Sequence, residues 1–459
     1  MNLVEISRKF IAIDSSHSQG TSDLVNFIEE LCAEYKLFVD IQDEVLEGRK
    51  EKNIIIRPHA ETMSGELLLQ THLDTPDPGI YSLWTKTGSN PFDGSIYGDE
   101  LYGLGVADVK LDFLCKLMAM IQGIELGHTP NAVLVGTFAG GSSMAGAVKL
   151  IRRGKINASH ALVGHPTELK LINASAGYAA VEITIPFSDE EMNYHREHDL
   201  RVSSSCQSKM FYGEAGHSSH TLLKENAIIN MMEFLGQLPE GIAVLDMEGG
   251  SHFNAIPESA VLEFDIMGGF KQPTVVVKTA KIVEIVKQVE AEFENFPCEG
   301  FTPSVPTLNI GTVKKQKDYL RFTGSCRITP NIAQNTYEEW MGRIDSVCKE
   351  VGATFRIVDY KSAFSTKEDS RFLKLAKTAL QSLDVEVDVD YGKISATTEA
   401  SVFHRMGIQC LVFGAGTHAN NSHEPNEKVS LRELQHSVDF YEKILQNYNG
   451  LNKSNGAES

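Results

Sequence analysis

The chain lacks an excess of basic residues, a paired-cysteine motif and any apolar run long enough to span a membrane. Lys and Arg number 42 against 61 Asp and Glu, which gives a net charge of −19 at pH 7. A charge of this sign disfavours nucleic acid and anionic membrane surfaces as partners. Residues 1–5 also do not begin a basic and then apolar leader. We therefore expect no nucleic-acid partner and no membrane anchor.

The seven cysteines are scattered, odd in number and nowhere spaced as Cys-x-x-Cys. This usage is typical of reduced thiols rather than of a disulfide framework or a zinc ribbon. The sequence therefore predicts a cytoplasmic protein.

With 459 residues, 42% of them hydrophobic, the chain has the size and composition of a globular protein of two or three domains. Helical spacing alternates with apolar strand-length runs up to about residue 175 and again from about residue 369, which predicts an α/β domain. Between them the pattern changes to exposed strands and amphipathic helices, and residues 188–200 are predicted as a charged, solvated loop. Residues 307–362 repeat the element order of the preceding segment, a candidate internal duplication.

The apolar run of residues 67–71 ends in His72, and Asp74 follows two residues later. A strand that delivers a histidine at its carboxyl end presents it at the edge of an α/β sheet where ligands bind. The aspartate can hold the imidazole from behind and fix which ring nitrogen faces a metal. A lone histidine after a strand is more often structural, so this pattern needs support from elsewhere in the chain.

Three more candidate metal ligands are found at comparable places. His165 follows a predicted strand at 160–163, and His423 lies in the loop after a predicted strand at 409–413. Asp108 stands where a helix is predicted to begin, so it either caps that helix or binds a cation. Ligands bind in such folds at the carboxyl ends of the strands, and we expect these side chains there.

Six motifs, taken in order, resemble the dizinc amidohydrolase family of acetylornithine deacetylase, succinyl-diaminopimelate desuccinylase, aminoacylase and glutamate carboxypeptidase. The motifs lie at residues 68–75, 103–110, 164–167, 216–219, 254–257 and 423–427. The resemblance implies a zinc-peptidase-like α/β catalytic domain, formed by residues 1–173 and 363–459. It also implies an inserted α+β lid domain at residues 174–362.

The resemblance further implies roles for individual residues. His72, Asp108 and His423 match metal ligands, with Asp108 bridging two zinc ions. Asp74 matches the carboxylate behind the first histidine. His217 matches the lid histidine that polarises the scissile carbonyl group, a form of oxyanion stabilisation.

Two residues of the expected lid are candidates for binding substrate. Asn254 lies in one of the matching motifs. The guanidinium of Arg327 can clamp a substrate carboxylate through two hydrogen bonds, although an ordinary surface arginine is the alternative. The implied substrate is an N-acyl amino acid or a short peptide.

The sequence departs from the family at the two adjacent glutamates that follow the strand predicted at 131–138. Gly140 and Gly141 stand there, and no acidic residue occurs between Asn131 and Arg152. The first glutamate of the family is the general base, whose loss typically costs about 10²–10⁴-fold in rate. The second is a metal ligand, so its loss leaves one of the two ions with too few donors.

The remaining donors still suffice for one metal ion. His165 stands where many relatives have Glu or Asp, and His72, Asp108 and His165 can form a three-ligand site with one open position. One or two zinc ions are therefore expected, with cobalt or manganese as alternatives. Three other acids could replace the missing base, although each has a structural interpretation as well: Glu399, Glu424 and Glu427.

Two hypotheses for the function follow. In the first, the protein is a metal-dependent hydrolase of an amide or peptide bond with an atypical active site. In the second, it is a non-hydrolytic relative, either a ligand-binding protein or an enzyme of acyl transfer or condensation. A doubled lid can imitate the lid dimer of simpler relatives within one chain, which favours a monomer over a homodimer.

Overall fold

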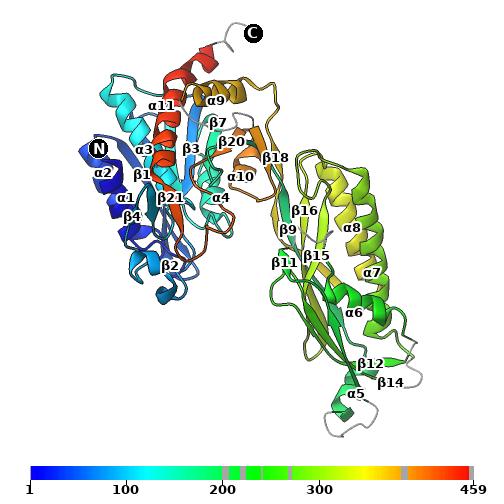
Figure 1. Cartoon of the computed structure of the whole chain (residues 1–459). Helices are drawn as coiled ribbons and strands as arrows, with labels where there is room; N and C mark the ends of the chain where they lie inside the picture. Colours follow the sequence, from blue (N-terminus) through cyan, green and yellow to red (C-terminus); the bar gives the residue numbers. More distant parts are fainter. Residues whose placement is uncertain are drawn as a thin grey trace. The chain divides into compact units, whose positions relative to one another are not determined.

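The computed structural model describes residues 2–198, 206–217, 224–238, 241–266, 271–383 and 391–453 (Figure 1). The chain divides into two compact units. Unit 1 comprises residues 1–175, 364–394 and 398–459, and unit 2 comprises residues 176–363 and 395–397.

Unit 1 is built on a nine-stranded sheet. Its central strands β6, β3, β7 and β20 run parallel to one another, and they are flanked by the antiparallel neighbours β2 and β8. The order is β1 (Phe38–Leu46), β2 (Arg49–Arg57), β6 (Ala132–Thr137), β3 (Glu66–His72), β7 (Ala158–Gly164), β20 (Gln409–Phe413), β8 (Leu171–Ser175) and β18 (Phe364–Ser365), with β19 (Tyr391–Ile394) paired to β8.

Helices cover both faces of this sheet, which is why its central strands are continuous apolar runs. In β3, Leu67 and Leu69 pack in the larger hydrophobic cluster and Leu68 packs in the cluster on the opposite face. The first face is covered by α1 (Leu3–Ala12), α2 (Ser22–Glu34), α3 (Lys110–Glu125), α9 (Arg371–Gln381) and α11 (Leu431–Lys453), and the second by α4 (Ala145–Arg152) and α10 (Ala400–His404).

A small three-stranded sheet brings the end of the chain back beside the loop that carries Asp108. Its strands are β4 (Ser95–Tyr97), β5 (Glu100–Tyr102) and β21 (Lys428–Ser430). Lys428 pairs with Tyr102 across this sheet, so the segment after His423 is fixed next to the segment before Asp108.

Unit 2 is a seven-stranded antiparallel sheet with helices packed against it. The strand order is β10 (Gln207–Tyr212), β14 (Ser259–Ile266), β12 (Ile242–Gly249), β15 (Thr307–Lys315), β16 (Tyr319–Ile328), β9 (Gly177–Pro186) and β17 (Thr354–Lys361). The other elements are the strand pair β11 (Gly216–His217) and β13 (Ala255–Ile256) and the helices α5 (Asp189–His198), α6 (Ala227–Leu235), α7 (Val275–Glu292) and α8 (Gln334–Glu350). The α/β fold with an α+β lid domain is as expected, and the duplication stays a prediction.

The prediction of a solvated loop at residues 188–200 is wrong for its described part, because residues 189–198 form α5. The side chain of Ser188 accepts a hydrogen bond from the Glu191 amide, and the Glu191 carboxylate accepts one from the Ser188 amide. This reciprocal pairing is a capping box, which starts a helix. His195 is buried, and its Nε2 lies 2.8 Å from the carbonyl oxygen of Val244.

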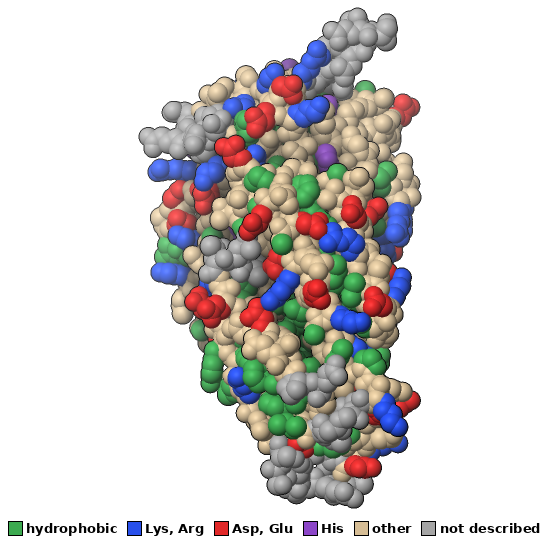
Figure 2. All heavy atoms as spheres, turned by 90° about the vertical axis from the view of Figure 1, so that its right-hand side faces the viewer, with side chains coloured by type: hydrophobic (Ala, Val, Ile, Leu, Met, Phe, Trp, Pro, Cys, Tyr) green, Lys and Arg blue, Asp and Glu red, His purple; other side chains and the backbone are tan. Residues whose placement is uncertain are grey.

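Among the described helices, none has both the length and the hydropathy needed to cross a bilayer. On the face shown in Figure 2, acidic and basic side chains are interspersed rather than segregated by sign.

Candidate metal centre

The candidate site of unit 1 is centred on Asp108. This side chain is buried, and its two carboxylate oxygens face two different histidines. The Nε2 atom of His72 lies 3.6 Å from Oδ1, and Nε2 of His423 lies 2.8 Å from Oδ2. Burial opposes ionisation of Asp108, but the neighbouring imidazoles of His423 and His72 lower its pKa well below the usual value. A carboxylate with one oxygen toward each histidine has the arrangement of a bridging ligand.

The loop that carries Asp108 is held by the buried carboxylate of Glu427. Its oxygens accept hydrogen bonds from the backbone N–H groups of Gly105 at 2.8 Å, Ala107 at 2.8 Å and Asp108 at 2.9 Å. These three hydrogen bonds favour the ionised form of Glu427, but burial has the larger effect and raises its pKa to about 7. Glu427 therefore has a structural task that occupies both of its oxygens.

His72 is oriented by Asp74 from the opposite side. Its Nδ1 atom lies 3.1 Å from the backbone carbonyl oxygen of Asp74 and 3.5 Å from the Asp74 carboxylate. A proton on Nδ1 satisfies these acceptors and leaves Nε2 toward Asp108, the arrangement of a ligand histidine with an outer hydrogen bond. Burial alone would lower the pKa of His72, but Asp74 and Asp108 raise it well above the ordinary value.

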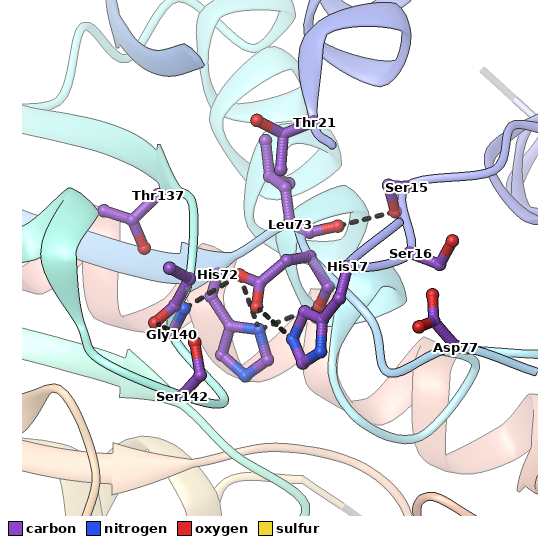
Figure 3. A network of polar contacts seen from close by, with 12 residues as sticks. Ser15, Ser16, His17, Thr21, His72, Leu73, Asp77, Thr137, Gly140 and Ser142 are labelled. Atoms are coloured by element: carbon purple, nitrogen blue, oxygen red, sulfur yellow. Dashed lines mark hydrogen bonds and ion pairs between the residues drawn. The ribbon is translucent and has the colours of Figure 1, made fainter. Parts of the chain in front are cut away.

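The sequence did not single out His17, which is also part of this network (Figure 3). Nε2 of His17 lies 3.4 Å from Oδ2 of Asp74, and the imidazoles of His17 and His72 are next to each other in Figure 3. The neighbouring carboxylate of Asp74 raises the pKa of His17. The only available signal was a histidine within the turn at residues 15–18, a position that carries no information about which strand end it meets.

His165 and His423 are joined by a third histidine, His418, that the sequence analysis also missed. The ring of His418 has its centroid 5.4 Å from that of His165 and 5.8 Å from that of His423. Burial lowers the pKa of His165 to about 4, so its imidazole is neutral at pH 7, the form that binds metals. A signal existed in the residues, because His418 lies in the same loop after β20 as His423.

The two glycines at the expected glutamate positions differ in the space around them. A Cβ atom built on Gly140 would lie 2.3 Å from Cβ and 2.5 Å from Cγ of His72. The Gly140 amide donates a 2.8 Å hydrogen bond to Asp74, which fixes the backbone there. A Cβ atom on Gly141 has no closer neighbour than Oδ2 of Asp74, at 3.9 Å. Position 140 is therefore closed to a side chain and position 141 is open.

These donors fit one metal ion better than two. Zinc bonds of about 2.0–2.2 Å place tetrahedral donors roughly 3.4 Å apart. The separation of 3.6 Å between His72 and Asp108 suits an ion between them, whereas 2.8 Å between His423 and Asp108 is a direct hydrogen bond. Within the described residues, no three His, Cys, Asp or Glu side chains converge on one point as they stand. Binding would require His423 or His165 to move toward the ion.

Of the three acids considered as replacements for the base, only Glu399 is still a candidate on structural grounds. Its buried carboxylate accepts hydrogen bonds from Thr137 Oγ1 at 2.9 Å and from Gln70 Nε2. Burial raises the pKa of Glu399 to about 7. Glu424 is exposed in the loop, and Glu427 is committed to the backbone.

Unit 2 contains the other predicted site residues. His217 belongs to β11 and pairs with Ala255 of β13, and its side chain lies outside what the structure describes. The guanidinium of Arg327 lies 5.2 Å from the Tyr178 ring centroid and 3.4 Å from Oδ1 of Asn254. Its Nε atom is buried and has no hydrogen-bond partner among the described residues. Arg327 is thus held in place rather than being an ordinary surface arginine.

Curated relatives share sequence with much of this chain. Acetylornithine deacetylase from Erwinia tasmaniensis is 27% identical over 244 residues, which cover 52% of this chain and 55% of that protein. The chain thus spans about half the length of that relative. A probable succinyl-diaminopimelate desuccinylase from Staphylococcus aureus is 22% identical and matches over 86% of this chain and 85% of its own length.

Solved structures share the fold over nearly the whole chain. Aminoacylhistidine dipeptidase from Vibrio alginolyticus superposes with a TM-score of 0.63 at 15% identity and covers 92% of each chain. A metallo-carboxypeptidase of family M20 from Sulfolobus solfataricus superposes with a TM-score of 0.59 at 15% identity, over 98% of this chain and 99% of its own. The sequence itself matches one family over residues 68–447, and the chain belongs to that family, peptidase family M20/M25/M40.

Proposed function

We propose that this protein is a metal-dependent hydrolase that cleaves an amide or peptide bond in an N-acyl amino acid or a short peptide. The observation that carries the proposal is the placement of Asp108 between His72 and His423. Membership of the family and the activities for which the relatives are named, deacetylation, desuccinylation and dipeptide cleavage, supply the substrate class.

The proposed centre holds one ion, bound by His72 and Asp108 with His165 or His423 completing the set. Imidazole nitrogens and a carboxylate suit zinc, and cobalt or manganese are the alternatives. A bound ion of this kind polarises a carbonyl oxygen and lowers the pKa of water. The chain's own residues fix the centre: Asp74 holds the tautomer of His72, and Glu427 holds the loop of Asp108.

The proposed roles of unit 2 are recognition and carbonyl polarisation. Arg327 offers a partly buried guanidinium, and Asn254 supports it. Such a fork pairs well with the carboxylate of an amino acid. We assign carbonyl polarisation to His217. We also propose a cytoplasmic monomer, on the scattered free cysteines and the long lid.

A second candidate function is supported by Gly140. The general base of the family is absent at this position, and no other side chain can replace it there because His72 lies too close. Without water activation the same site would bind an acylated amino acid or transfer its acyl group. This non-hydrolytic relative is the alternative that the first experiment must separate.

The test is metal content by elemental analysis on protein purified without chelator, followed by assays on N-acyl amino acids and dipeptides. We expect one equivalent of metal and a hydrolytic rate that chelator removes and added metal restores. His72→Ala should lose both metal and activity. His128→Ala, at an exposed histidine, is the matched control and should keep both. One equivalent of metal without hydrolysis of any substrate would instead favour the non-hydrolytic relative.

Gly141→Glu sharpens this test because position 141 has room for a side chain. The substitution returns a carboxylate ligand of the family type. We expect metal content to rise from one equivalent toward two, measured by calorimetric titration with Zn²⁺. A Gly141→Gln variant is the isosteric control and should not change the stoichiometry. If the stoichiometry did not change in Gly141→Glu, the site for a second ion would be missing further ligands besides this glutamate.

A further inference from the structure

Unit 2 contains a cavity of about 270 Å³ that is lined by its sheet and by three helices, α6, α7 and α8. Figure 1 shows these helices beside the strands of unit 2. The strands β9, β15, β16 and β17 form one wall. Most of the lining is apolar, including Val181 and Ile183 from β9, Ile229 from α6 and Val286 from α7. No residue of the candidate metal centre lines it.

The cavity exists because the helices do not close over the inner strands. Val181 and Ile183 lie on β9, which is hydrogen-bonded on both sides, yet both side chains are only partly buried. Gly324 pairs with Val181 on the next strand and adds no side chain. A Cβ atom on Gly324 would meet the Asn309 carbonyl oxygen at 2.3 Å, because β15 bulges there. The backbone therefore keeps this part of the wall free of a side chain.

The charged groups that border the cavity balance in number. Lys224 and Lys287 stand against Glu225 and Glu290. Lys287 is already paired with Glu233 at 2.7 Å, and Lys224 donates to the Ala215 carbonyl oxygen. Because both lysines are already engaged, an anionic ligand would find no free positive charge there. Burial raises the pKa of Glu290, which disfavours its charged form as a partner for a cation. Burying an unpaired charge among apolar side chains is costly.

We propose that this cavity is a binding site for an uncharged, hydrocarbon-rich small molecule. An apolar cavity of about 150 Å³ stays dry and binds benzene, so 270 Å³ suits a ligand of roughly ten non-hydrogen atoms. The proposal is independent of the hydrolase function, since it concerns residues of unit 2 that have no assigned role.

The chain's two tryptophans make the test specific to each unit. Trp84 is buried in unit 1 and Trp340 is buried in unit 2. In a Trp84→Phe background, fluorescence of Trp340 reports thermal unfolding of unit 2, and the Trp340→Phe background reports unit 1. The probe is n-octanol, with octanoate as its charged counterpart.

At a concentration of ten times its Kd, n-octanol should shift the unfolding equilibrium of unit 2 about 11-fold toward the folded state. This corresponds to a rise in the Tm of unit 2 of about 3–5 °C, whereas the Tm of unit 1 should not change. Val181→Phe fills the cavity and should abolish this response, and Ile229→Phe tests the same volume from the helix side if the first variant does not fold. Val358→Phe, at an exposed valine of β17, is the matched control and should respond as the parent does.

Four results would overturn the proposal. The first is no shift of unit 2, and the second is an equal shift of both units, which would be a general solvent effect. The third is an undiminished response in a folded Val181→Phe variant. Tighter binding of octanoate than of n-octanol would refute the uncharged character of the ligand.

Discussion

Because position 140 has no room for a side chain, alanine substitutions at the adjacent Gly140 and Gly141 should have different effects on stability. Gly140→Ala places a Cβ atom 2.3 Å from Cβ of His72, and neither that atom nor the backbone can yield cheaply. Overpacking of this kind costs about 1–3 kcal/mol. Moving the backbone would also weaken the hydrogen bond from the Gly140 amide to the Asp74 carboxylate, worth about 1.5–3 kcal/mol. We expect Gly140→Ala to lower the free energy of unfolding of unit 1 by about 2–5 kcal/mol.

Gly141→Ala is the control, because the new methyl group meets nothing closer than 3.9 Å. Removing a glycine at an unstrained position stabilises a protein by about 0.4–1 kcal/mol through the unfolded chain. The assay is urea unfolding without metal, followed by Trp84 fluorescence in a Trp340→Phe background. If the free energies of unfolding of the two alanine variants differed by less than about 0.5 kcal/mol, position 140 would have room for a side chain. The inference that a general base cannot be placed there would then be wrong.

Three further predictions concern buried or partly buried charges. Because the folded pKa of Glu399, about 7, lies above its ordinary 4.5, the folded state binds more protons in that interval and stability falls as pH rises through it. Glu399→Gln should therefore be more stable than the parent by about 3 kcal/mol at pH 8 and equal to it at pH 4 in urea unfolding, and a gain of the same size at both pH values would contradict this. Glu427→Gln should cost about 1–3 kcal/mol and weaken metal binding, measured by Zn²⁺ titration, because a glutamine amide has one acceptor oxygen and its NH₂ group would face a backbone N–H of the Asp108 loop. Arg327→Met should raise KM about 10- to 100-fold with little change in kcat for substrates that have a free carboxylate, and amidated substrates should show no such difference.

The strand-end residues could be predicted because their signals are local. The leucines at residues 67–69 pack against both faces of the sheet, so this part of the run had to be apolar, and His72 is the first residue of the strand that is not fully buried. The same reasoning located His165, and the motif order located Asp108 and His423.

Residues that enter the site from distant loops could not be found this way. His17 meets Asp74 through a bridge between Ser16 and Thr75, and nothing in the turn specifies that pairing. The closure at Gly140 depends on the distance to His72, which no sequence pattern encodes. The helix at residues 189–198 was missed for another reason, since its capping box was visible at Ser188 and Glu191 but the charge of the segment was given more weight.

The clamp between Glu427 and the loop of Asp108 has a consequence for how the protein is made. The groups it joins are more than 300 residues apart in sequence, with all of unit 2 synthesised between them. During synthesis His72 and Asp108 leave the ribosome long before His423 and Glu427, so the nascent chain has a half-built site whose aspartate loop lacks its anchor. At the proposed metal centre, metal capture would thereby be tied to completion of the chain, and a product truncated before β20 lacks both the anchor Glu427 and the proposed ligand His423.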